Sequence, residues 1–163
     1  MRINTKSSEQ TQEVGKILGE EILASALEEP IVIALAGDLG AGKTTFVKGL
    51  AKGLGIETTV VSPTFILIGS YQSNPGLKTS AQGGPALGGK NLKLKTLYHL
   101  DPYRLADASS LVPELDELLQ IPHAVIAIEW AERLKQYIPK QAIHIALEHT
   151  NNDERNITIS FLE

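Results

Sequence analysis

The sequence contains no cysteine. Disulfide bonds, thiolate metal sites and cysteine nucleophiles are therefore excluded. Aromatic residues are also scarce, at 5% of the 163 residues. No apolar run approaches the roughly 18 residues of a membrane-spanning helix, and the N-terminal segment lacks the apolar core of a signal peptide. We therefore expect a cytoplasmic protein that has no contact with a membrane.

Basic residues are outnumbered by acidic ones, with 15 Lys and Arg against 19 Asp and Glu, which gives a net charge of −4. A protein that binds nucleic acid through its whole surface usually carries a basic face, so any contact with RNA has to be local or made through a partner. The length and the 42% content of hydrophobic residues are typical of one soluble globular domain, which we expect to span residues 1–163.

The first part of the chain is predicted to form a helix, then a strand, a glycine-rich loop and a second helix. Ser7 and Gln10 form a capping signature, and apolar residues at helical spacing follow until Pro30. The continuous apolar run 31–36 predicts a strand buried on both faces. After the loop, apolar residues at helical spacing resume from Lys43, and Gly55 is placed to end that helix.

Further elements are predicted from apolar runs and turn residues. Strands are expected at 58–61 and 65–71, on either side of a break at 62–64, and again at 97–100 and 124–128. A short helix is expected to begin at Pro113. Alternating apolar residues over 143–147 and 157–161, around the turn cluster 151–153, predict a hairpin. The sheet is therefore expected to be mixed.

The segment 72–95 does not fit a compact fold. It holds five glycines, two prolines, four lysines (Lys78, Lys90, Lys93 and Lys95) and no acidic residue. Too few apolar residues are present to offset the entropy of ordering such a chain, so we interpret it as a flexible basic insertion within the domain. It is either a solvated linker or a tether to tRNA phosphate or to an acidic patch on a partner.

The residues from 37 to 44 satisfy the complete P-loop pattern G-x-x-x-x-G-K-[ST]: Gly37, Asp38, Leu39, Gly40, Ala41, Gly42, Lys43 and Thr44. Glycines let several backbone amides point at one phosphate, and the following helix adds its positive end. The lysine brings a cation to the β and γ phosphates, and the threonine hydroxyl is a magnesium ligand. The pattern predicts binding of ATP or ADP with Mg²⁺ in an α/β single-domain P-loop NTPase fold. We expect a mixed, mainly parallel central sheet flanked by helices.

Two carboxylates follow predicted buried strands. Glu129 comes after 125–128 and occupies the position at which P-loop enzymes hold magnesium, and Asp101 comes after 97–100. An exposed acid at a strand end and, for Asp101, a turn-initiating Asp-Pro are the alternative readings. Trp130 would lie near the nucleotide, although a lone tryptophan is more often core. The four histidines lack metal-ligand spacing, and we interpret them as structural.

Four motifs in order resemble those of the TsaE family, also called YjeE. They are the P-loop with its following Thr45, Ser62-Pro63-Thr64-Phe65, His99-Leu100-Asp101-Pro102-Tyr103-Arg104-Leu105 and Ile128-Glu129-Trp130-Ala131-Glu132. The resemblance covers the chain except the insertion 72–95. It implies an ATPase, slow on its own, that acts with TsaB and TsaD when these proteins transfer a threonylcarbamoyl group to the tRNA adenosine beside the anticodon. ATP hydrolysis would reset that complex between turnovers, and tRNA would be met indirectly through it.

The resemblance also implies roles for individual residues. Lys43, Asp101 and Glu129 would be catalytic, and magnesium would be held by Thr44, Asp101 and Glu129. Thr45 would lie beside the α phosphate, and Trp130 in the nucleotide site. The remaining assignments are a nucleotide-sensing switch at Ser62 and Thr64 and a contact of Thr11 with the base. The roles of Tyr103 and Arg104 stay open between bracing the fold, contacting a partner and approaching phosphate.

Two other classes of protein contain the same P-loop, and both remain alternatives. A small-molecule P-loop kinase must shield the transferred phosphoryl group from water, usually with arginines on a lid. This chain has only Arg2, Arg104, Arg133 and Arg155, and none lies in the segment 72–95. A nucleotide-binding regulator without hydrolysis would not require Asp101 and Glu129.

Overall fold

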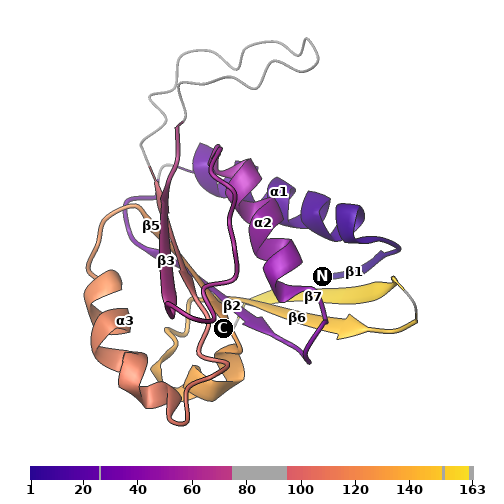
Figure 1. Cartoon of the computed structure of the whole chain (residues 1–163). Coiled ribbons are helices and arrows are strands. Elements are labelled where there is room, and N and C mark those ends of the chain that lie inside the picture. Colours follow the sequence, from indigo (N-terminus) through magenta and orange to yellow (C-terminus); the bar gives the residue numbers. More distant parts are fainter. Residues whose placement is uncertain (26, 75–94, 152, 162–163) are drawn as a thin grey trace.

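The computed structural model describes residues 1–25, 27–74, 95–151 and 153–161. One seven-stranded sheet crosses the molecule in the order β1-β7-β6-β2-β5-β4-β3, with α1 and α2 on one face and α3 on the other (Figure 1). The strands are β1 Arg2–Thr5, β2 Ile31–Ala36, β3 Ile68–Gln72, β4 Thr96–Leu100, β5 Ala124–Glu129, β6 Ile143–His149 and β7 Arg155–Phe161. The helices are α1 Ser8–Ala24, α2 Lys43–Gly53 and α3 Val112–Leu118, with 3₁₀ helices η1 Ala108–Leu111 and η2 Ala131–Tyr137. No helix in this described part of the chain is long and apolar enough to cross a membrane.

The centre of the sheet is parallel and its edges are antiparallel. Strand β2 pairs in parallel with β5 and β6, and β4 pairs in parallel with β5. The outer pairs β3–β4, β6–β7 and β1–β7 are antiparallel. The predicted α/β fold with a mixed sheet is confirmed. Because β2, β4 and β5 run the same way, the residues that follow them meet at one edge of the sheet.

Helices α1 and α2 pack so closely that glycines line their contact. Apolar residues of both helices cover one face of the sheet, including Phe46, Leu50 and Ile22. At Gly49, an added Cβ would lie 1.9 Å from the backbone oxygen of Gln12, and at Gly15 it would lie 2.3 Å from the backbone oxygen of Phe46. The two backbones therefore touch where a side chain would otherwise hold them apart.

We expect Gly49→Ala to destabilise the protein by about 1–3 kcal/mol, the usual cost of overpacking. Helix propensity alone predicts the opposite sign, because alanine is favoured over glycine by up to about 1 kcal/mol in a helix interior. The clash is with backbone, which cannot swing aside. Urea unfolding followed by circular dichroism measures the change, with Lys48→Ala on the exposed side of the same helix as the control. A Gly49→Ala protein as stable as its parent would contradict the packing described.

The structure corrects the strands expected at 58–61 and 65–71. Residues 58–61 form no ladder, although Val60 is buried in the core, so their apolar character reflects a loop that packs against the sheet. The carbonyl of Pro63 accepts hydrogen bonds from the amides of Ile66 and Leu67, which makes a tight turn. Leu67 has a φ of 66°, and the strand begins only at the next residue.

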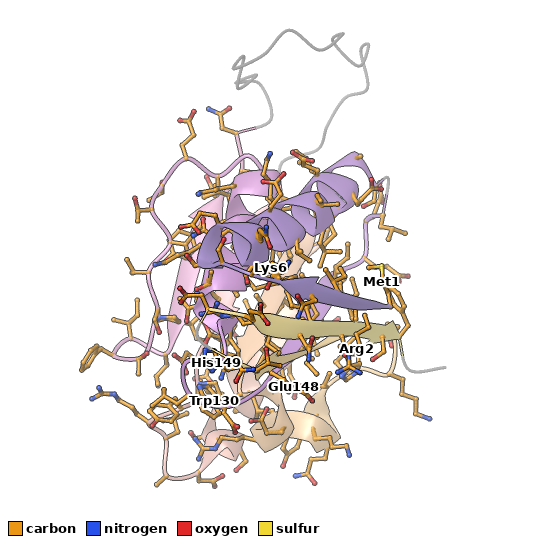
Figure 2. The ribbon with its side chains drawn as sticks, turned by 90° about the vertical axis from the view of Figure 1, so that its right-hand side faces the viewer. Met1, Arg2, Lys6, Trp130, Glu148 and His149 are labelled. Atoms are coloured by element: carbon orange, nitrogen blue, oxygen red, sulfur yellow. The ribbon has the colours of Figure 1, made fainter. Side chains whose placement is uncertain are left out.

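Strand β1 was not predicted from the sequence. Four residues are too short for a clear alternation, and the strand exists because it pairs with β7, about 150 residues away in the chain. Figure 2 shows this edge of the sheet, with Met1 near one end of the strand and Lys6 just past the other. The amino group of Met1 donates a hydrogen bond to the carbonyl of Ile159 at 2.7 Å.

The ends of the predicted insertion 72–95 belong to the sheet. Gln72 is the last residue of β3. The amide of Ser73 donates to the carbonyl of Lys95 at 2.9 Å, and the amide of Lys95 donates back to Ser73 Oγ at 2.8 Å. Lys95 is 2% exposed, so it does not contribute to a basic tether as the sequence suggested. Residues 75–94 of the insertion, with Lys78, Lys90 and Lys93, lie outside the described residues.

Candidate nucleotide-binding site

The loop between β2 and α2 has the backbone shape that a phosphate cradle requires. Gly37, Gly40 and Gly42 have φ values of 140°, 79° and 103°, which residues with a side chain rarely adopt. A Cβ on Gly37 would also lie 2.2 Å from the carbonyl oxygen of Leu147. The first residue before α2, Gly42, carries no side chain that could cap the helix. The amides at the start of α2 are therefore left to an anionic ligand.

A cavity of about 470 Å³ opens over this loop and collects most of the predicted site. Its volume suits a small-molecule ligand. Its walls come from the P-loop, the 62–64 segment and the ends of β4 and β5. The lining residues are Leu39, Gly40, Gly42, Lys43, Thr44, Thr45, Ser62, Thr64, Asp101, Tyr103, Arg104, Glu129 and Trp130. Gly37, Asp38 and Ala41 shape the loop without lining the cavity.

Lys43 is held inside the loop rather than extended into solvent. Its side chain is 4% exposed, and its ammonium group donates to the carbonyls of Gly37 and Asp38, the latter at 2.9 Å. The nitrogen also lies 3.6 Å from the centre of the Trp130 ring. Burial lowers the pKa of Lys43, and the negative charges nearby, first that of Glu129, oppose this shift. A phosphate would bind this cation more strongly than neutral carbonyls do.

Thr44 and Glu129 are joined across the cavity. Thr44 Oγ1 donates to Glu129 Oε1 at 2.7 Å, and the glutamate, the last residue of β5, is 3% exposed. Among the described residues, no group of three or more His, Cys, Asp or Glu side chains is arranged as a metal site. Magnesium beside a nucleotide needs no such cage, because one or two protein oxygens, phosphates and water complete its shell. The hydroxyl and carboxylate present fit that requirement.

Asp101 binds the segment that the sequence had suggested as a switch. Its Oδ2 accepts hydrogen bonds from Ser62 Oγ at 2.9 Å and from Thr64 Oγ1 at 2.8 Å. Its Oδ1 accepts from the amide of Tyr103 at 3.0 Å, and the side chain is 3% exposed. The sequence indicated a carboxylate and a switch separately, and the structure shows that they are one hydrogen-bonded unit.

The comparison with known proteins decides the family. A family model described as threonylcarbamoyl adenosine biosynthesis protein TsaE matches residues 5–157. The chain is 35% identical over 161 residues to the tRNA threonylcarbamoyladenosine biosynthesis protein TsaE of Bacillus subtilis, covering 98% of this chain and 85% of that protein. The chain belongs to the TsaE family. The protein of the same name from Treponema pallidum is 34% identical over 160 residues, covering 98% of this chain and all of the relative.

A solved structure is similar over the whole chain. The crystal structure of Bacillus subtilis YdiB superposes with a TM-score of 0.70 at 31% sequence identity, over the whole of this chain and 86% of that one. The resemblance noted from four short motifs therefore extends through the fold.

In this TsaE-family chain, two aromatic rings close one side of the cavity. Trp130 and Tyr103 are stacked, with ring centres 4.8 Å apart and planes at 26°. Trp130 has a φ of 54°, a strained value for a large residue and one that tends to persist at functional sites. Arg104 lies 4.3 Å from the centre of the Phe65 ring. Tyr103 and Arg104, whose roles the sequence left open, thus both belong to the cavity wall.

Thr11 and His99 are not among the residues that line the cavity. Thr11 has no exposed surface, and its Oγ1 is bonded to Thr5 Oγ1 at 2.9 Å and to the carbonyl of Ser7 at 3.1 Å. It packs behind Gly42 and does not line the cavity. His99, interpreted as a structural histidine, lies with Nε2 2.8 Å from Glu129 Oε1. Its position two residues before Asp101, near the end of a predicted strand, was the signal that could have found it.

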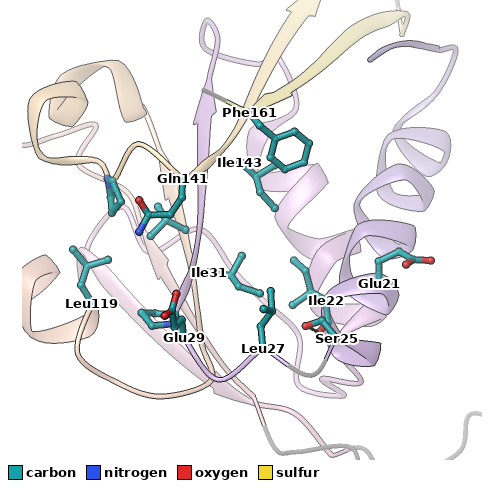
Figure 3. Close-up of a pocket in the computed structure, with 13 residues that line it drawn as sticks. Glu21, Ile22, Ser25, Leu27, Glu29, Ile31, Leu119, Gln141, Ile143 and Phe161 are labelled. Carbon is teal, nitrogen blue, oxygen red and sulfur yellow. Dashed lines mark hydrogen bonds between the residues drawn. The ribbon is translucent and has the colours of Figure 1, made fainter. Parts of the chain in front are cut away.

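A second cavity lies at the other end of the parallel strands (Figure 3). Its volume is about 750 Å³, larger than the first, and Figure 3 shows Ile31, Ile143 and Phe161 around it. The described residues that line it include neither lysine nor arginine, and no glycine loop faces it. It therefore lacks the groups that hold a phosphate, and size alone does not identify the nucleotide site.

Proposed function

We propose that this TsaE-family protein is a magnesium-dependent ATPase of tRNA threonylcarbamoyladenosine biosynthesis. The observation that carries the proposal is the convergence of Lys43, Thr44, Glu129 and Asp101 on one cavity above the P-loop. A P-loop alone only binds nucleotide, whereas hydrolysis requires a held metal and a positioned water. The two buried carboxylates at the ends of β4 and β5 are the groups that meet those needs.

Each residue has a distinct part in the proposed reaction. Lys43 leaves its loop carbonyls to bind the β and γ phosphates, and the amides before α2 hold the phosphate oxygens. Thr44 and Glu129 would hold Mg²⁺, which would supply positive charge beside those phosphates. Asp101 orients the attacking water in this proposal. Because it already holds Ser62 and Thr64, that step is coupled to the position of the 62–64 segment.

An apolar rim beside the cavity is evidence that partner proteins take part in this function. The rim consists of Leu39, Val61, Phe65 and Ile66, all exposed. Leu39 lies in the P-loop and the other three flank the residues bound by Asp101. Exposed apolar residues gathered at one place mark contact sites. We place TsaB and TsaD there, so that nucleotide hydrolysis changes the surface that they bind and resets the complex.

We expect ATP hydrolysis by the protein alone to be slow and to rise when TsaB and TsaD from the same source are added. Phosphate release is measured in both conditions. Ile66→Ser is expected to reduce the stimulation, because the rim loses part of its apolar contact. Ile17→Ser, an exposed isoleucine on α1, is the matched control and should be stimulated like the parent. Equal rates with and without the partners would contradict the partner proposal.

The same assay separates the two alternative functions. A kinase would consume ATP only with an acceptor, and a regulator would release no phosphate. One observation already counts against a kinase lid: Arg133 donates to the carbonyls of Pro102, Tyr103 and Leu105, so it braces the loop after β4.

A further inference from the structure

The buried histidine of β4 contacts the glutamate of the proposed magnesium site. His99 has no exposed surface and lies between Gly69 of β3 and Ala127 of β5 in the sheet register. Its Nε2 is 2.8 Å from Glu129 Oε1. The same oxygen accepts the hydrogen bond of Thr44 Oγ1 at 2.7 Å. Within the described residues, both side-chain hydrogen bonds of this carboxylate thus fall on one oxygen.

Two donors on one oxygen fix how the carboxylate is turned. An ionised glutamate can only accept, so His99 presents Nε2 as its N–H. Rotation about the last torsion of Glu129 would break both hydrogen bonds together. The second oxygen, Oε2, is thereby kept for a metal ion or a water molecule. A glutamate side chain has several rotatable torsion angles, and this pair of donors fixes the last of them.

The other ring nitrogen of His99 shows that this arrangement has a cost. Nδ1 is buried and has no hydrogen-bond partner in the described structure. An unsatisfied buried polar atom destabilises the folded protein, and a leucine or methionine at this position would avoid that cost. Such atoms in folded proteins call for a functional explanation. The contact with Glu129 supplies one, because Nε2 reaches the carboxylate where an apolar side chain could donate no hydrogen bond.

Strand β4 ends at Leu100, and Asp101 follows it directly, two residues beyond His99. One strand end therefore sets both carboxylates of the site. It holds Glu129 through His99 and presents Asp101 directly to the 62–64 segment. Apart from His99, no residue is needed to connect this strand end to the two carboxylates.

We propose that His99 is a positioning residue that fixes the Glu129 carboxylate and thereby sets the magnesium affinity of the nucleotide site. The inference rests on the proposed function, which assigns Glu129 to magnesium. Loss of a partner that orients a metal-binding side chain typically costs about 10- to 100-fold in metal affinity. His99 itself touches neither nucleotide nor metal in this proposal.

The test compares two amides at position 99. His99→Gln places its amide nitrogen near the position of Nε2 and keeps the hydrogen bond to Glu129. His99→Asn places the amide nitrogen near Nδ1, too short to reach. Calorimetry measures ADP binding with EDTA and with Mg²⁺ for both variants and the parent. We expect similar ADP affinities in EDTA for all three proteins. The Mg²⁺-induced gain should be near the parent value in His99→Gln and reduced about 10-fold in His99→Asn.

Folding is checked by circular dichroism and by the fluorescence of Trp130, the sole tryptophan. Equal Mg²⁺-induced gains in the two variants would overturn the proposal, and so would an equal loss of ADP affinity with and without Mg²⁺. His99→Leu, which fills the space without a donor, should behave as His99→Asn if it folds. These binding measurements need no hydrolysis. A parent protein that binds Mg²⁺ and ADP but releases no phosphate would sink the ATPase proposal and leave the role of His99 standing.

Discussion

Replacing Lys43 with alanine is expected to weaken the binding of both ATP and ADP by about 10- to 100-fold. Hydrogen bonds to charged groups contribute about 1.5–3 kcal/mol, which corresponds to that loss of affinity. The buried ammonium is the cation that the P-loop itself supplies, and it is held by the carbonyls of that loop. Isothermal titration calorimetry in the presence of Mg²⁺ measures both affinities.

Lys48→Ala is the control for this experiment, since Lys48 is on the same helix and faces solvent. It should bind both nucleotides as the parent does. The fluorescence of Trp130 offers a second readout, because the indole loses the cation that lies 3.6 Å from its ring. Unchanged ATP and ADP affinities in Lys43→Ala would refute the assignment of the phosphate site.

Glu129→Gln and Asp101→Asn are expected to lower hydrolysis at least about tenfold while nucleotide binding in the absence of Mg²⁺ stays within a few-fold of the parent. Both changes keep the shape of the side chain and remove its charge. A group that acts on metal or water in the transition state affects kcat more than ground-state binding. The comparison is made from single-turnover hydrolysis with Mg²⁺ and from ADP affinity in EDTA.

Asp116→Asn, an exposed aspartate on α3, is the control for loss of one negative charge. The two site variants should differ in one respect. Asp101→Asn leaves Ser62 and Thr64 with a weaker acceptor, so it should also raise the susceptibility of the 62–64 segment to proteolysis. If both variants hydrolyse ATP at the parent rate, the assignment of the two carboxylates is wrong.

Local sequence information was sufficient for the phosphate cradle. The spacing of Gly37, Gly42 and Lys43 encodes a turn with left-handed φ values and the start of a helix, and each of these is decided within a few residues. The buried strands β2 and β5 could also be predicted from the sequence, because a strand covered on both faces must be apolar throughout. The hairpin of β6 and β7 followed from alternation around a turn.

The incorrect expectations arose where apolar composition was taken as evidence of strand pairing, or polar composition as evidence against it. The apolar character of 58–61 is real, but Val60 packs its side chain without its backbone joining a ladder. Conversely, Gln72 and Lys95 looked like parts of a flexible segment and are held by the pairing of β3 with β4. Backbone pairing depends on what lies alongside, which composition does not record.

The sequence by itself determined the P-loop, the central parallel strands and the placement of Asp101 and Glu129 after strands. Only the tertiary structure decided which side chains meet at the ends of those strands. The bonds of Asp101 to Ser62 and Thr64 and of His99 to Glu129 join residues 30 or more positions apart. Such contacts are set by strand order and by the direction of each side chain on its strand. A local motif carries neither, because both result from the packing of the whole sheet.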